Sequence, residues 1–148
     1  MSMRGTYVWV GVILVMVLVW IPASRAQAPR PAGTTGTVSG NAEHGRYLVE
    51  SVAMCFECHS GRDSRGNIIE TQRYMGGLIP FAPPWPNDWA TRAPRNKGLP
   101  GYDDMLALRL LTEGSIGRKG EQLRPPMPRF HMTRQDAADV IAFMRSVP

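Results

Sequence analysis

The chain has 148 residues, enough for one modest domain together with a targeting segment. Hydrophobic residues make up 43% and charged residues 20%, which is ordinary for a globular protein, while 13 prolines and 15 glycines predict a fold rich in loops. The net charge of +5 is spread along the chain without a run of five or more basic residues. This distribution argues against a basic nucleic-acid-binding tail, and we expect no nucleic acid partner.

The first 26 residues have the layout of a secretory signal peptide. Arg4 precedes an uncharged, almost wholly apolar run over residues 7–21, and Ser24 and Ala26 supply small residues before a cut after Ala26. An uncleaved membrane anchor is the alternative, although a full span needs about 20 apolar residues. We therefore expect a periplasmic protein, or one tethered to the periplasmic face of the inner membrane if the segment is retained.

The remaining chain divides into an arm and one domain. Residues 27–40 (QAPRPAGTTGTVSG) offer little to bury and predict a flexible arm. The ordered domain is expected over residues 41–148. If the signal is removed, Arg4 and Arg25 leave with it and the net charge falls from +5 to +3.

Three segments of the domain carry helical patterns. The first covers residues 41–54, with Asn41 as its cap, and the second covers residues 103–113 and stops at Gly114. The third, residues 133–147, has Thr133 and Asp136 spaced as a capping box. Turn residues crowd the stretch 60–101, which predicts a long irregular loop. The domain is therefore expected to be all-α, with little sign of strands.

The only two cysteines lie in the heptapeptide MCFECHS, where His59 directly follows Cys58. A structural zinc ion needs four ligands, and Cys55, Cys58 and His59 supply three at most. A redox-active CxxC disulfide belongs at the start of a helix near a βαβ pattern, whereas here a helix precedes the site. The third interpretation is covalent attachment of c-type haem, for which CxxCH is the signature.

The spacing of this motif suits haem attachment. The two thiols add to the two vinyl groups of one haem as thioethers, and the adjacent imidazole comes under the iron and binds it. A large apolar disc also accounts for the long loop, since it replaces much of a conventional core. Five side chains are candidates to pack on it, and for each aromatic among them ordinary core is the alternative: Phe56, Tyr74, Leu78, Phe81 and Trp85.

The second axial ligand is expected to be Met127, in the sequence Pro125-Pro126-Met127-Pro128. The flanking prolines stiffen this loop, which suits a weak thioether ligand. His131, Met132, another methionine and an open site are the alternatives. His44 is expected to be a solvated surface residue, and four other methionines are expected to fill the core: Met54, Met75, Met105 and Met144.

Three stretches carry a family resemblance: GRYLVESVAMCFECHS, DDMLALRLLTEG and PPMPRFHMTRQDAADVIAFMRSVP. Together they resemble class I monohaem c-type cytochromes, and more narrowly the cytochrome c domains of bacterial periplasmic dehydrogenase electron-transfer subunits. The resemblance implies three or more helices with long loops wrapped around one covalent haem c and its iron. It implies thioether bonds at Cys55 and Cys58, with His59 as proximal and Met127 as distal ligand. It also implies that Gly45 lies where the first and last helices cross, beside Phe143.

The stretch FAPPWPNDWATRAPRNKGLP departs from the family in its tryptophan and proline content. This departure leaves the hydrogen-bond acceptor of the His59 imidazole unassigned.

The expected function is electron transfer and not catalysis. A dehydrogenase, a membrane cytochrome complex or a terminal oxidase is the expected partner. The alternative is a haem sensor or catalytic haem subunit with an open distal site. An obligate subunit of a larger complex is a third possibility. Four basic residues are expected either to form a docking rim or simply to be solvated: Arg118, Lys119, Arg124 and Arg129.

Overall fold

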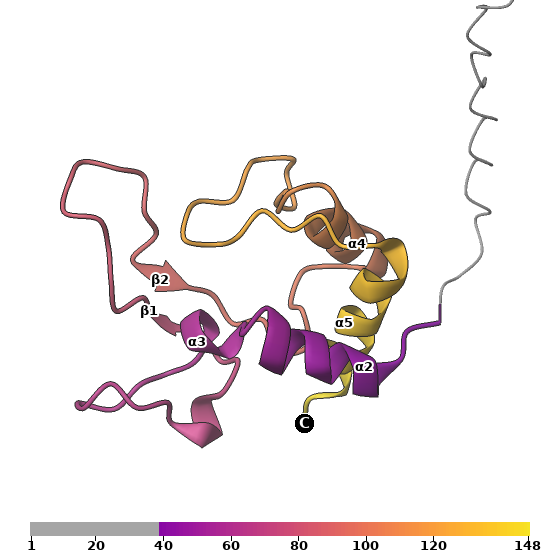
Figure 1. Ribbon diagram of the computed structural model, residues 1–148, viewed down its shortest axis with the longest axis horizontal. Coiled ribbons are helices and arrows are strands. Elements are labelled where there is room, and N and C mark those ends of the chain that lie inside the picture. Colours follow the sequence, from indigo (N-terminus) through magenta and orange to yellow (C-terminus); the bar gives the residue numbers. More distant parts are fainter. Residues whose placement is uncertain (1–38) are drawn as a thin grey trace, which may run out of the picture. The chain divides into compact units, whose positions relative to one another are not determined.

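A computed structural model describes residues 39–148, so the segment predicted to be a signal peptide and most of the predicted arm lie outside the described residues. In chain order it contains α2 (Ala42–Tyr47), a π-helical turn (Leu48–Val52), α3 (Phe56–His59), a 3-10 turn (Glu70–Gln72), β1 (Gly77–Leu78), β2 (Arg92–Ala93), α4 (Asp104–Thr112) and α5 (Arg134–Ser146). Among these helices none is both long and apolar enough to span a bilayer. The domain is mostly helix and loop, as expected (Figure 1).

The first helix begins as predicted, because the Asn41 side chain accepts hydrogen bonds from the backbone N–H groups of Glu43 and His44. It does not continue as one α-helix to residue 54. A π-helical turn replaces its second half, and Met54 adopts a positive φ of 45°. The chain is thereby redirected directly before Cys55, which starts the short helix α3 that carries the cysteine motif.

Both later helices have side-chain caps, of which only the one at Thr133 was predicted. Asp103 accepts from the N–H of Leu106 at the start of α4, and Thr133 accepts from the N–H of Asp136 at the start of α5. Gly114, with a φ of +87°, follows the end of α4 as its stop. The boundaries of both helices agree with the sequence analysis within two residues at each end.

Helices α2 and α5 cross in direct contact, as the resemblance implied. A β-carbon on Gly45 would overlap the backbone carbonyl of Asp139 and lie 3.0 Å from Cβ of Phe143. Only glycine allows this approach of the two backbones. Helix α4 also packs on α5, and the buried core is gathered around these three helices: Val49, Tyr74, Ala107, Leu111, Ala137, Val140, Ile141 and Met144.

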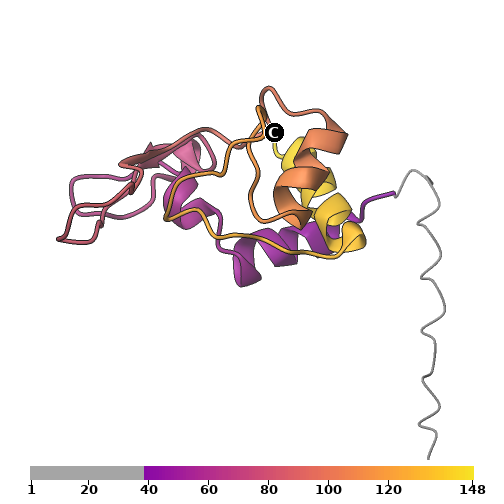
Figure 2. The same ribbon diagram turned by 90° about the horizontal axis from the view of Figure 1, so that it is seen from above.

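The long stretch 60–101 is mainly loop, with one addition that the sequence did not predict. Strands β1 and β2 pair antiparallel, with Gly77 opposite Ala93 and Leu78 opposite Arg92. The loop that joins them, residues 79–91, projects away from α4 and α5 in both ribbon views (Figures 1 and 2). Ser60 is fully buried at its base and its hydroxyl accepts a hydrogen bond from the N–H of Tyr74.

Candidate haem site

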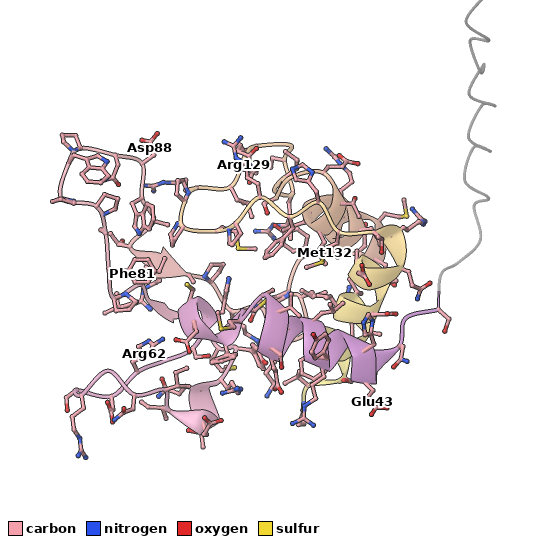
Figure 3. All side chains as sticks on the ribbon, viewed as in Figure 1. Glu43, Arg62, Phe81, Asp88, Arg129 and Met132 are labelled. Atoms are coloured by element: carbon pink, nitrogen blue, oxygen red, sulfur yellow. The ribbon has the colours of Figure 1, made fainter. Side chains whose placement is uncertain are left out.

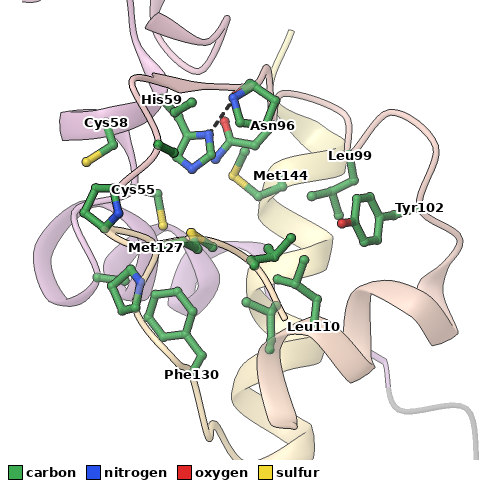
Figure 4. A pocket seen from close by; sticks show the side chains of 18 of the residues that line it. Cys55, Cys58, His59, Asn96, Leu99, Tyr102, Leu110, Met127, Phe130 and Met144 are labelled. Atoms are coloured by element: carbon green, nitrogen blue, oxygen red, sulfur yellow. Dashed lines mark hydrogen bonds between the residues drawn. The ribbon is translucent and has the colours of Figure 1, made fainter. Parts of the chain in front are cut away.

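A cavity of about 480 Å³ lies within the domain, and segments from residue 53 to residue 144 contribute to its wall. Its volume falls within the range of small-molecule and cofactor sites. Side chains in the wall are mostly apolar, and they include Leu99, Tyr102, Leu110, Phe130 and Met144 (Figure 4). Cys55, Cys58, His59 and Met127 all line this same cavity. The structure therefore brings together every residue that the sequence analysis assigned to the site.

The imidazole of His59 is held by one hydrogen bond. Its Nδ1 lies 2.7 Å from the backbone carbonyl oxygen of Pro94. A carbonyl can only accept, so Nδ1 carries the proton and Nε2 keeps its lone pair. Burial lowers the pKa of His59, although the bond to Pro94 opposes this shift. The ring is thus neutral and oriented, which is the form that binds a metal.

The two thiols are free in the described structure. Burial raises the pKa of Cys55 to about 11, and burial also raises the pKa of Cys58. Redox-active CxxC motifs instead have a thiol with a lowered pKa, so the redox-disulfide alternative loses support. The zinc alternative also fails, since within residues 39–148 Cys55, Cys58 and His59 do not gather their ligand atoms around one point.

The three candidates for a second ligand are placed differently. Met127 and Met132 line the cavity, and Met127 faces His59 across it (Figure 4). His131 is exposed, and its ring lies beside Gly114. It contributes nothing to the cavity wall. The bis-histidine alternative is therefore not supported by this arrangement.

Contact with the haem is not supported for any of the five candidate side chains, because none of them lines the cavity, and only Tyr74 is a buried residue of the ordinary core. Leu78, Phe81 and Trp85 are exposed, with 65%, 56% and 65% of their surface accessible, because they project from the 79–91 loop and its base. Phe56 instead packs under the guanidinium of Arg73, at 4.1 Å. Tyr74 is buried between the helices and stacks edge-on against Phe143.

Other expectations also need correction. Of the four methionines expected in the core only Met144 is buried. Met54 is exposed and lines the cavity wall, while Met75 and Met105 are exposed in a turn and on α4. His44 is exposed as expected, but its Nδ1 also lies 2.8 Å from Oδ2 of the buried Asp139. 

The basic residues considered for a docking rim differ in their surroundings. Arg118 lies over the Tyr102 ring at 5.7 Å, and Arg124 is hydrogen-bonded to backbone carbonyls. Arg129 lies at the outer edge of its loop (Figure 3).

Sequence reasoning missed Pro94, Tyr102 and Phe130. Pro94 acts through its carbonyl oxygen, so no side-chain pattern could identify it. Tyr102 directly precedes the cap of α4, and Phe130 lies three residues after Met127. Both positions are next to elements that were predicted, and this proximity was the available signal.

The cytochrome c family model matches residues 42–148. The chain belongs to the cytochrome c family. Comparison with the curated proteins gives no match. Membership implies a covalently attached haem c with its iron, and Cys55 and Cys58 have the spacing of the CxxCH attachment motif. It also implies haem-based electron transfer with a redox partner, and not an enzymatic activity.

The residues of this cytochrome fit a haem. The apolar wall suits the macrocycle, two free thiols lie at its edge, and the unprotonated Nε2 of His59 is available to the iron. The thioether of Met127 offers a second neutral ligand on the facing side (Figure 4). This donor set is the one found in electron-transfer cytochromes.

Proposed function

We propose that this cytochrome is a periplasmic one-electron carrier whose haem is bonded to Cys55 and Cys58 and ligated by His59 and Met127. The observation that carries the proposal is that His59 and Met127 line one apolar cavity from facing sides. When bound, the haem iron supplies one-electron redox chemistry, and a methionine opposite a histidine raises its potential.

The protein contributes orientation and exclusion of water. Pro94 accepts the Nδ1 proton of His59 at 2.7 Å, which fixes the plane of the ring and increases its basicity as a ligand. The apolar wall, including Leu110 and Phe130, keeps the local dielectric constant low. If His59 and Met127 both bound the iron, no position would be left on it for a substrate, and this arrangement would favour a carrier over a catalyst.

A dehydrogenase is the proposed electron donor, because the sequence resembles the cytochrome c domains of dehydrogenase electron-transfer subunits. A membrane cytochrome complex or a terminal oxidase is the proposed acceptor. The proposed location rests on the signal-like first 26 residues, and a retained segment would tether the domain to the periplasmic face of the inner membrane.

Replacement of Met127 tests the ligation. We expect Met127→Ala in the oxidised holoprotein to lose the weak near-infrared sulfur-to-iron absorption band while the haem stays covalently attached. Met75→Ala is the matched control, because Met75 is exposed and lies outside the cavity wall, and its spectrum should equal that of the wild type. An unchanged spectrum in Met127→Ala would remove this residue from the site.

The alternative, a haem sensor or catalytic subunit with an open distal site, has a distinct signature. Such a protein would be high-spin in its resting state, and its spectrum would shift when carbon monoxide is added. The carrier should be low-spin and should not respond at the same gas concentration. Size-exclusion chromatography of native extract would separate a free carrier from an obligate subunit.

A further inference from the structure

Two loops on one side of the cavity are fastened to each other. The first is the Trp89 loop, residues 79–91, and the second is the Met127 loop, residues 122–130. Arg124 donates from Nε to the carbonyl oxygen of Asp88 at 2.7 Å and from Nη2 to that of Trp89 at 3.0 Å. The N–H of Ala90 donates back to the carbonyl oxygen of Pro125 at 2.7 Å. One short segment of each loop thus carries all three bonds.

The Trp89 loop is a firm support for these bonds, although its tip is exposed. The indole N–H of Trp89 donates to the carbonyl oxygen of Phe81 at 2.9 Å, and the two rings pack edge to face at 6.0 Å. The backbone N–H of Trp89 donates to Oδ1 of Asn87 at 2.7 Å. At the base of the loop the N–H of Ile79 donates to the carbonyl oxygen of Thr91 at 3.0 Å. The two carbonyls that receive Arg124 are therefore held in place from within the loop.

The Met127 loop has a second attachment on the far side of the methionine. The hydroxyl of the buried Ser115 donates to the carbonyl oxygen of Pro128 and accepts from the N–H of Phe130. Arg124 lies three residues before Met127 and Pro128 one residue after it. The loop is thus fixed on both sides of Met127, and Arg124 is the only side chain among residues 39–148 that hydrogen-bonds it to the Trp89 loop.

We propose that Arg124 is a positioning residue for the distal ligand: by joining the Met127 loop to the Trp89 loop, it holds the Met127 thioether inside the cavity. This inference rests on the proposed function, in which Met127 binds the iron. A thioether is a weak ligand, so the fraction of time that its loop spends in place sets how readily another ligand displaces it.

The geometry requires a guanidinium and not merely a positive charge. Arg124 reaches two successive carbonyl oxygens from two different nitrogens of one planar group. A lysine ammonium is a point charge on a flexible stem and does not present two donors in a fixed fork. Lysine at this position would keep the charge beside the cavity and lose the double contact.

The chain that follows the Trp89 loop leads to Pro94, the residue that holds the His59 imidazole. Five residues beyond Trp89, the carbonyl oxygen of Pro94 accepts the proton of His59. The segment from Trp89 to Pro94 therefore connects the support of Met127 with the support of His59. Loosening at Arg124 is expected to affect mainly the Met127 side, because β2 pairs with β1 between these two contacts.

The test compares four oxidised holoproteins: wild type, Arg124→Ala, Arg124→Lys and Arg129→Ala. Arg129 is the matched control, because it is an exposed arginine of the same loop with no hydrogen bond or ion pair recorded within the described residues. The readouts are the near-infrared sulfur-to-iron band, the apparent affinity for added imidazole, and amide hydrogen exchange over residues 79–91 and 122–130.

We expect Arg124→Ala to bind imidazole about tenfold more tightly, because the loss of charge-assisted hydrogen bonds raises the population of the displaced loop. Exchange should speed up in both loops and stay unchanged in α5. Arg124→Lys should resemble Arg124→Ala, and Arg129→Ala should resemble the wild type.

Two results would contradict the inference alone: a normal band with unchanged imidazole affinity in Arg124→Ala, or wild-type behaviour in Arg124→Lys. Absence of the band from the wild type itself would instead contradict the proposed function. In that case hydrogen exchange still reports separately whether Arg124 joins the two loops.

Discussion

The α-carbon of Gly45 lies against the backbone carbonyl oxygen of Asp139, so that α2 and α5 touch backbone to backbone. Beside this contact the side chain of Asp139 forms hydrogen bonds that link the start of α2 to α5. Its Oδ1 accepts from the N–H of Asn41 at 2.6 Å and from Gln135 at 2.9 Å, and its Oδ2 faces His44 at 2.8 Å. The two ends of the domain are thus joined at one point, and its stability should depend strongly on these residues.

Gly45→Ala should lower the free energy of unfolding by about 3 kcal/mol, because the added methyl group overlaps the Asp139 carbonyl and forces the helices apart. Denaturant unfolding of the holoprotein measures this as a lower midpoint with an unchanged slope. Ser51→Ala, at an exposed position of the neighbouring π-helical turn, should change stability by less than about 0.5 kcal/mol. Equal midpoints for the two variants would contradict close packing at Gly45.

Asp139→Asn should reduce stability at neutral pH and have less effect in acid. Burial alone raises the pKa of the Asp139 carboxyl, but hydrogen bonds from Asn41, His44 and Gln135 outweigh it and lower the pKa below its ordinary value of 3.8. A carboxyl with a lowered pKa in the folded state stabilises fully above 3.8, and this contribution is lost as the pH falls through the folded-state value.

The expected loss at pH 7 in Asp139→Asn is about 1–3 kcal/mol. The difference from the wild type should shrink as the pH is lowered from 5 to 2 (about the span of such a transition). Asp88→Asn makes the same chemical change at an exposed side chain and should leave the free energy of unfolding unchanged at each pH. If the difference in the free energy of unfolding between the wild type and Asp139→Asn stayed constant with pH, the Asp139 charge would not stabilise the fold.

The wild type should lose stability at high pH as the Tyr74 phenol ionises, and Tyr74→Phe should not show this loss. Burial is the main cause that raises the pKa of Tyr74 to about 12, and its hydroxyl donates to Glu50 at 3.3 Å. Because the raised value favours the neutral phenol in the folded state, its stabilisation is complete below the ordinary pKa of 10 and is lost as the pH rises through 12.

At neutral pH the loss of one hydrogen bond in Tyr74→Phe should cost about 1 kcal/mol. Unfolding measured between pH 9 and pH 12 should show the wild type losing this advantage while Tyr74→Phe does not. Tyr47→Phe, at a position that is 57% exposed, serves as the control. Parallel curves for the wild type and Tyr74→Phe would contradict a buried, neutral phenol.

Phe130→Ala should destabilise the holoprotein by about 3–5 kcal/mol, because its ring lines the haem cavity. Trp85→Ala, which removes a larger side chain, should change stability by less than about 0.5 kcal/mol because 65% of that residue is exposed. Thermal unfolding followed through the haem absorbance compares the two. A greater loss for Trp85→Ala would place the tip of the 79–91 loop in the core.

The sequence was a good guide wherever a residue acts through its own local pattern. Asn41 and Thr133 cap their helices as predicted, because a cap is a local hydrogen bond between a side chain and the next turn. The four proposed site residues, which the structure places on one cavity, were also chosen from local patterns. CxxCH is a fixed spacing, and the prolines around Met127 distinguish it from the other methionines.

The sequence was a poor guide wherever tertiary contacts decide. Aromatic character led to the prediction that Phe81 and Trp85 pack inside, yet the antiparallel pairing of β1 and β2 carries their loop outward. That pairing involves two residues on each strand, too few to give a period-two pattern. The acceptor for His59 is a main-chain oxygen 35 residues away in the chain, and composition contains no signal for it.

The small size of the buried side chains bears on how this protein is made. Four of the ten buried hydrophobic residues within the described part of the chain, residues 39–148, are alanines, so this domain by itself has little apolar surface to hold three helices together. The prosthetic group is therefore expected to act as a folding nucleus as well as a redox centre. A chain that has left the ribosome without it should stay open and accessible to proteases, and thioether formation should precede helix docking. Maturation and quality control would then be a single step.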